Sequence, residues 1–157
     1  MVGQQKIEVI GAEPRPVGFA AALPRYAAIP ITVMITPRSH ASTAIADLEG
    51  HAEVLVWACD PSAIEAAVLI AAGASAYVTE LEELAVAVQA VSWGEAWLAP
   101  VAAAAVCRLA RVTRDPGLSE FAVAARAAAS GLAWPLACGA AGVTQTRSLL
   151  MQLRRQL

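Results

Sequence analysis

The sequence predicts an α/β fold, in which a parallel sheet of about four strands over residues 1–100 is followed by a small all-α unit over residues 118–157. Short β-rich runs alternate with helical patterns along the first hundred residues, which is the order of a parallel sheet covered by helices. Charge also divides the chain, because residues 1–107 carry eleven acids and four bases, whereas residues 108–157 carry two acids and seven arginines. This asymmetry favours two units, the second of which either faces a polyanion or presents a solvated basic surface.

Four segments have the composition of strands. Residues 6–12 alternate between apolar and polar types, and residues 29–35 (IPITVMI) form an almost continuous apolar run that is typical of a buried parallel strand. Two shorter β-rich runs follow at residues 53–57 (EVLVW) and 76–79 (AYVT). The spacing between these runs leaves room for a helix after each strand, so we expect a parallel rather than an antiparallel sheet.

The intervening segments carry helix signals. Ser39 or Ser42 can cap a helix that extends towards residue 51, and Ser62 after Asp60-Pro61 opens another that ends at Gly73. Leucines and valines recur at helical spacing between residues 80 and 91, after an acidic first turn that suits the helix dipole. The remaining helices are expected at residues 17–24, at residues 101–113 within a linker over 101–117, and beyond residue 118.

Composition excludes several classes of protein. The hydrophobic fraction is 58% and the mean hydropathy is +0.57, but no apolar stretch of about 18 residues is uninterrupted, so we expect no membrane span. The first residues lack the pattern of a secretion signal. Cys59, Cys107 and Cys138 are far apart, and His40 and His51 do not have a metal-ligand spacing, so we expect buried, reduced thiols and neither a metal nor a cofactor.

Residues 70–100, IAAGASAYVTELEELAVAVQAVSWGEAWLAP, carry the most informative pattern. They resemble the last third of a receiver domain from response regulators of the NarL/LuxR type, where a helix runs into "AGASGYL" and a later helix ends in "GE…LAP". The resemblance implies a flavodoxin-like receiver. This chain is shorter than the family's receiver by about one βα unit, which is roughly 25–30 residues.

The same resemblance assigns positions to the phosphorylation pocket of a receiver. Its acid pair corresponds to Ala12 and Glu13, and its lysine corresponds to Glu80. Its phosphoacceptor corresponds to Ala58 in the alignment that we prefer, which places the missing unit just after residues 53–57, or to Thr36 if the front of the domain is shortened instead. Phosphoryl transfer to a receiver needs carboxylates around a divalent cation, an aspartate nucleophile and a compensating lysine. We therefore expect no Mg²⁺-dependent phosphorylation.

Two alternatives concern the degenerate pocket. Asp60 lies two residues beyond Ala58, so a shift in register would bring a carboxylate to the site, although Pro61 favours a helix-capping role. In the preferred alignment the emptied pocket is lined by Ala58, Trp57 and Cys59. Such a pocket is either filled by its own side chains or binds a small apolar ligand.

Residues 118–157 resemble a divergent LuxR-type helix-turn-helix. Leu118-Ser119-Glu120 matches the opening of that motif, Gly131-Leu132 matches the turn after its first long helix, and Val143-Thr144 matches the turn before its recognition helix. The sequence departs from the family at Pro135, which lies inside the short scaffold helix. It departs again at the next residue, where leucine replaces a glutamate of the family.

The last helix carries polar groups that suit DNA. Arginine and glutamine read base edges in the major groove, and threonine and arginine hold phosphates. A crowded apolar run at residues 149–153 supports the alternative that this helix packs on its neighbours or on a second subunit. The candidate DNA-binding residues are Thr144, Gln145, Thr146, Arg147, Arg154 and Arg155.

The resemblance implies a cytoplasmic, homodimeric transcription regulator that binds DNA without control by phosphorylation. An alternative is a regulatory protein that binds another regulator through its receiver-like unit and no longer contacts DNA. Exposed apolar surface around Trp93 and Trp97 would favour that alternative. A small-ligand sensor or an enzyme is a weaker alternative. We expect no enzyme, because no paired nucleophile, base or carboxylate constellation is visible.

Overall fold

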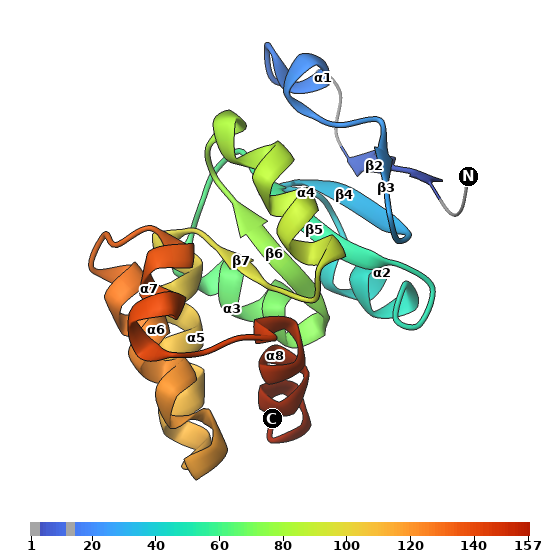
Figure 1. Ribbon diagram of the computed structural model, residues 1–157. Coiled ribbons are helices and arrows are strands. Elements are labelled where there is room, and N and C mark those ends of the chain that lie inside the picture. Colours follow the sequence, from blue (N-terminus) through green and yellow to red (C-terminus); the bar gives the residue numbers. More distant parts are fainter. Residues whose placement is uncertain (1–3, 12–14) are drawn as a thin grey trace.

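A computed structural model describes residues 4–11 and 15–157 of the chain (Figure 1). The strands are β1 (Gln5–Lys6), β2 (Glu8–Gly11), β3 (Tyr26–Ala27), β4 (Ile31–Thr36), β5 (Glu53–Ala58), β6 (Ala74–Val78) and β7 (Trp97–Leu98). The helices are α1 (Phe19–Ala22), α2 (Ala41–Asp47), α3 (Ala63–Ala72), α4 (Leu84–Ser92), α5 (Pro100–Thr113), α6 (Ser119–Ala129), α7 (Trp134–Ala141) and α8 (Thr146–Arg155), with short 3₁₀ turns η1 (Leu81–Glu83) and η2 (Pro116–Leu118).

The described strands form a five-stranded parallel sheet in the order β2-β4-β5-β6-β7, and β1 pairs separately with β3 in an antiparallel manner. The α/β class and the parallel sheet are therefore confirmed, but the expected strand count was one too low. The additional strand, β7, has only two residues and so carries no alternation that a sequence pattern can reveal. The predicted first strand is divided at Ile7, whose backbone N–H donates to the carbonyl oxygen of Arg25.

Each face of the sheet has its own helices. Met34, Val56 and Tyr77 belong to the core under α2, α3 and α5, whereas Val33 and Leu55 belong to the core under α1 and α4. Neighbouring residues of a strand point to opposite faces, so these two cores follow directly from the alternation along β4 and β5. All six residues of β4 are buried, as the apolar run at residues 29–35 predicts.

The connecting helices are divided between the two faces of the sheet. Helices α2 and α3 lie on one face, whereas α1 and α4 lie on the other. The described parallel strands lie side by side in chain order, so right-handed crossovers would place all the connecting helices on one face. The connections through α1 and α4 depart from that arrangement.

The C-terminal helices share a core with the sheet. Phe121, Trp134, Leu150 and Leu153 belong to the same continuous apolar cluster as Tyr77. Helix α5 packs against α3 and α6, α6 packs against α7, and α8 packs against α3 and α5. Figure 1 shows α5, α6 and α7 bundled together, with α8 returning beneath the sheet. The expected helices are thus present, but a separate helix-turn-helix unit is not confirmed. No helix in the described part of the chain has the length and apolar character to cross a membrane.

Candidate functional site

The carboxyl end of the sheet, where open α/β sheets usually bind ligands, is closed by a cluster of polar side chains. Thr36 at the end of β4 donates a hydrogen bond from Oγ1 to Oε1 of Glu65 over 2.9 Å, and the hydroxyl of Tyr77 donates to the same oxygen over 2.8 Å. Glu65 occupies this position because it lies in the first turn of α3. Ser62 caps that turn by accepting a hydrogen bond from the Glu65 backbone N–H over 2.9 Å.

Burial keeps the Tyr77 phenol protonated. Desolvation raises the pKa of Tyr77 well above its usual value, and its hydrogen bond to Glu65 raises the pKa further. The phenol therefore remains a donor, and one carboxylate accepts from two neutral hydroxyl groups. Within residues 4–11 and 15–157 no group of three or more His, Cys, Asp or Glu side chains could hold a metal ion. The predicted pocket positions Ala12 and Glu13 lie outside the described residues.

The other predicted pocket residues differ in exposure and in the face of the sheet that they occupy. Ala58 is buried beneath α3, whereas Glu80 is exposed after the end of β6. Trp57 points to the opposite face, where it contacts Phe19 with ring centroids 6.3 Å apart, because it precedes Ala58 in the strand. Cys59 is exposed. Trp57 and Ala58 therefore belong to the cores on opposite faces of the sheet, and the expectation that they line one pocket together with Cys59 is wrong.

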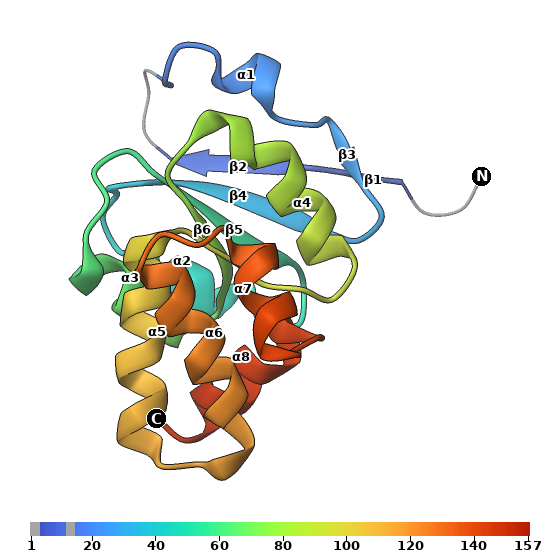
Figure 2. The same ribbon diagram turned by 60° about the vertical axis from the view of Figure 1, so that its left-hand side comes forward.

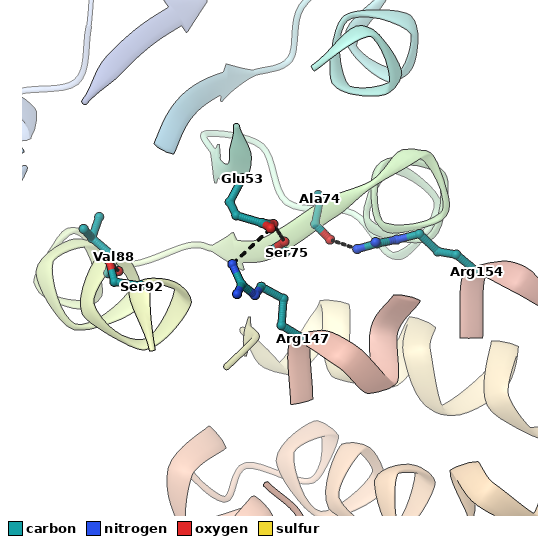
Figure 3. Close-up of polar contacts among 7 residues, drawn as sticks. All are labelled: Glu53, Ala74, Ser75, Val88, Ser92, Arg147 and Arg154. Carbon is teal, nitrogen blue, oxygen red and sulfur yellow. Dashed lines mark hydrogen bonds and ion pairs between the residues drawn. The ribbon is translucent and has the colours of Figure 1, made fainter. Parts of the chain in front are cut away.

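The amino end of the sheet holds α8 through charged groups (Figure 3). Arg154 donates from Nε to the carbonyl oxygen of Ile70 over 2.9 Å, and from Nη2 to the carbonyl oxygen of Ala74 over 3.0 Å. Arg147 forms an ion pair with Glu53 over 3.0 Å. Glu53 also accepts a hydrogen bond from the hydroxyl group of Ser75 on β6, as Figure 3 shows. Partial burial lowers the pKa of Arg154, while nearby carboxylates oppose this shift.

A second anchor holds the first turn of α8. Glu95 accepts hydrogen bonds from the backbone N–H of Gln145 over 2.8 Å and of Thr146 over 3.1 Å, and from the Thr146 hydroxyl over 2.6 Å. The hydroxyl of Thr146 accepts in turn from the backbone N–H of Ala96 over 2.7 Å. The N-cap residue of α8 provides no side-chain cap of its own. Glu95 therefore supplies, from a distant part of the chain, the negative charge that a helix N-terminus favours.

Half of the predicted DNA-binding residues thus make contacts within the protein. Thr146 is fully buried, and Arg147 and Arg154 are partly buried and bonded to the α/β unit. Positions 147, 150 and 154 lie at i, i+3 and i+7 and so share one helical face, which is a signal in the sequence for a docked helix. No sequence pattern points to Glu53 or Glu95 as their partners. The other predicted DNA-binding residues, Thr144, Gln145 and Arg155, are exposed.

A cavity of about 490 Å³ lies beside the anchored face of α8. Its lining includes Glu49, Glu53, Arg154 and Arg155, so both signs of charge meet there. Such a mixed lining favours water and internal ion pairing over a ligand of either charge.

Comparisons with protein-family models, with curated proteins and with solved structures find no match to this chain. The resemblance to NarL/LuxR-type regulators therefore rests on the sequence patterns alone.

Proposed function

We propose that this chain is a phosphorylation-independent, receiver-like regulatory protein that acts by binding another protein, while α8 stays fixed on its own α/β unit. The observation that carries the proposal is the set of bonds made by Thr146, Arg147 and Arg154. A recognition helix needs such side chains free to reach phosphates and base edges. Hydrogen bonds that involve charged groups contribute about 1.5–3 kcal/mol each, so lifting α8 onto DNA would break several of them.

The carboxyl end of the sheet supports the absence of phosphate control. Thr36 and Ala58, the two candidate phosphoacceptor positions, lack the carboxylate of an aspartyl phosphate. A phosphoryl group at Thr36 would also lie beside Glu65, which already accepts from the Thr36 hydroxyl. Like charges in a part-buried site repel, and Glu80 replaces the cation that would offset this repulsion.

The exposed surface along α4, from Val86 to Trp93 after its last residue, supports a protein partner. Trp93 is 69% exposed and Val86 is 44% exposed. Aromatic side chains are enriched at the centres of protein interfaces, where they lose water on binding. Trp97, in contrast, is half-buried and donates from Nε1 to Glu83 over 2.9 Å. Its indole is therefore engaged within the protein and is less available to a partner than that of Trp93.

DNA binding remains a second candidate, because arginines outside the anchored face of α8 are exposed. These are Arg108, Arg111, Arg114, Arg126 and Arg155. Binding through them would need no movement of α8, and it would involve phosphates more than base edges because most of these arginines lie on or beside α5 and α6.

Retention on duplex DNA across a salt series separates the two candidates. We expect no retention of the wild-type protein even at low salt. Retention that falls steeply with salt would instead support DNA binding, with a slope of about −0.9 per neutralised phosphate. In that case two double variants would identify the face that binds DNA. Loss of retention in Arg108→Ala/Arg111→Ala would indicate α5, and loss in Arg147→Ala/Arg154→Ala would indicate α8.

Two further measurements test the remaining parts of the proposal. Incubation with acetyl phosphate and Mg²⁺ should leave the intact mass unchanged, and a gain of one phosphoryl group would contradict phosphate independence. Cross-linking in the native cell should capture a protein partner with the wild type and lose it with Trp93→Ser. The purified partner must then reproduce this difference in a direct binding measurement.

A further inference from the structure

A small apolar cavity lies where α4, β7 and α7 meet. Its volume is about 270 Å³. Figure 2 shows α7 below α4. The residues that matter for its chemistry are Ala90, Trp97, Trp134, Cys138, Gly139 and Val143.

Most polar groups at the walls of this cavity are bonded within the protein, including the Glu95 carboxylate, which accepts from Gln145 and Thr146. Trp134 donates from Nε1 to the carbonyl oxygen of Ala96 over 2.9 Å, and the Nε1 donor of Trp97 is bonded to Glu83. Burial raises the pKa of the Cys138 thiol to about 12, so this thiol is neutral at physiological pH. The walls therefore offer ring faces and methyl groups, and a charged or strongly polar occupant would lose its hydration without compensation.

The size of the cavity limits its occupant. An apolar cavity of about 150 Å³ in another protein holds benzene, so the space here accommodates a molecule of one or two small rings. A peptide strand or a helix is too large for it. The cavity is also poorly suited to water, because ordered waters need two to four polar partners.

One wall of the cavity is also the anchor of α8. Glu95 and Ala96 line the cavity, and the same two residues hold Gln145 and Thr146 at the start of α8 through four hydrogen bonds. Trp134 is bonded to the carbonyl oxygen of Ala96 as well. A molecule that contacts Trp97 and Trp134 therefore displaces or tightens the segment on which the first turn of α8 rests.

We propose that this cavity binds a small, uncharged, aromatic or aliphatic molecule, and that its occupancy is coupled to the seating of α8. This inference is independent of whether the protein acts on a protein partner or on DNA. Such coupling requires the bound molecule to contact residues 94–97 differently when α8 is seated and when it is released.

Titration of the ¹⁵N-labelled full chain with indole, followed by NMR, tests this proposal. The indole Nε1–H signals of Trp97 and Trp134 should shift and saturate, and the backbone signals of Gln145 and Thr146 should shift with them. The Nε1–H signals of Trp57 and Trp93 should stay in place, because these residues lie outside the cavity. Benzene, as a second uncharged probe, should produce the same pattern, whereas benzoate should not.

A substitution that fills the cavity, together with a control at the next residue, tests the location of the binding site. Gly139 lines the cavity, and a Cβ atom at this position meets no heavy atom within 4 Å, so Gly139→Leu starts its side chain in free space beside the cavity. This variant should weaken indole binding at least tenfold. Ala140→Leu, at the next position of α7 and outside the lining, should leave the affinity unchanged.

Each other result would overturn one part of the inference. Equal binding by wild type and Gly139→Leu, shifts at Trp93 alone, or no saturation up to the solubility limit of indole would exclude the cavity as a binding site. Saturable shifts at Trp97 and Trp134 with no change at Gln145 and Thr146 would exclude the coupling to α8.

Discussion

The two ends of the parallel sheet use their polar residues in opposite ways. At the carboxyl end, the neutral hydroxyl groups of Thr36 and Tyr77 donate hydrogen bonds to Glu65, so these polar side chains are bonded to one another. At the amino end, Arg147 and Arg154 bring positive charge to Glu53 and to main-chain carbonyl groups. The end of the sheet that usually binds ligands has therefore become structural, and the opposite end has become the attachment site of the C-terminal helix.

The two ends also differ in the sequence separation of the residues that are bonded there. Thr36 and Glu65 are 29 residues apart and belong to neighbouring strand and helix units, whereas Arg154 is 84 residues from Ile70. Contacts at the amino end therefore join the middle of the chain to its last helix. Closing so long a loop costs conformational entropy that local contacts do not incur, so this end depends on strong, charge-assisted bonds.

The largest effect in this comparison is expected at Arg154. Arg154→Ala should lower the free energy of unfolding by about 2–3 kcal/mol, because it removes two charge-assisted hydrogen bonds and leaves two carbonyl groups with fewer donors. Arg155→Ala is the matched control, since the neighbouring side chain is exposed and should change stability by less than about 0.5 kcal/mol. Urea denaturation measures both variants. Equal effects would mean that the amino end does not hold α8.

The carboxyl end should show a smaller effect at Tyr77. Tyr77→Phe removes the hydroxyl donor to Glu65 and should cost about 1–2 kcal/mol in the free energy of unfolding. Tyr26→Phe provides the control, because Tyr26 is 56% exposed and its substitution should be nearly neutral. A neutral result for Tyr77→Phe would show that Glu65 finds other donors, and that the closed cluster is not a source of stability.

The pKa of Tyr77 gives the same site a pH signature. Because its pKa is raised in the folded protein, Tyr77 contributes stability that is fully present below the unfolded value of about 10 and is lost as the pH rises towards the folded value. The free energy of unfolding should therefore decline above about pH 10 in the wild type, and this decline should be shallower in Tyr77→Phe. Denaturation curves at several alkaline pH values provide the measurement, and parallel declines would contradict the assignment.

Local signals in the sequence predict much of the fold, but they predict little of the difference between the two ends of the sheet. The cap at Ser62 and the exit at Gly73 predict α3 almost to the residue, and the apolar run at residues 29–35 predicts a buried strand. β7 and the face occupied by α1 are not predictable in this way, because a two-residue strand and the side taken by a crossover depend on distant packing. Apolar spacing predicts that α8 is helical, but not which surface it contacts.

The candidate site shows the same limit. Sequence patterns identify Thr36 as one of two alternatives for the phosphoacceptor, but they do not pair it with Glu65, since a helix and a strand converge there only in the folded chain. The arginines of α8 are equally suited to phosphates and to carboxylates by type alone. In the folded chain Arg147 pairs with Glu53 and Arg154 with two main-chain carbonyl groups, and all of these partners lie far earlier in the chain.

The smallest effect, and the sharpest test of the contrast, concerns the pair of Arg147 and Glu53. Their side chains are 25% and 34% exposed, so solvent screens the attraction and a double-mutant cycle should give a coupling of about 0.5–1 kcal/mol. This coupling should shrink as salt is added, whereas the effect of Arg154→Ala should persist because its partners are main-chain carbonyl groups. A coupling near zero at low salt would assign the seating of α8 to Arg154, Glu95 and the apolar core alone. Arg147 would then be free to exchange Glu53 for another anion without releasing the helix.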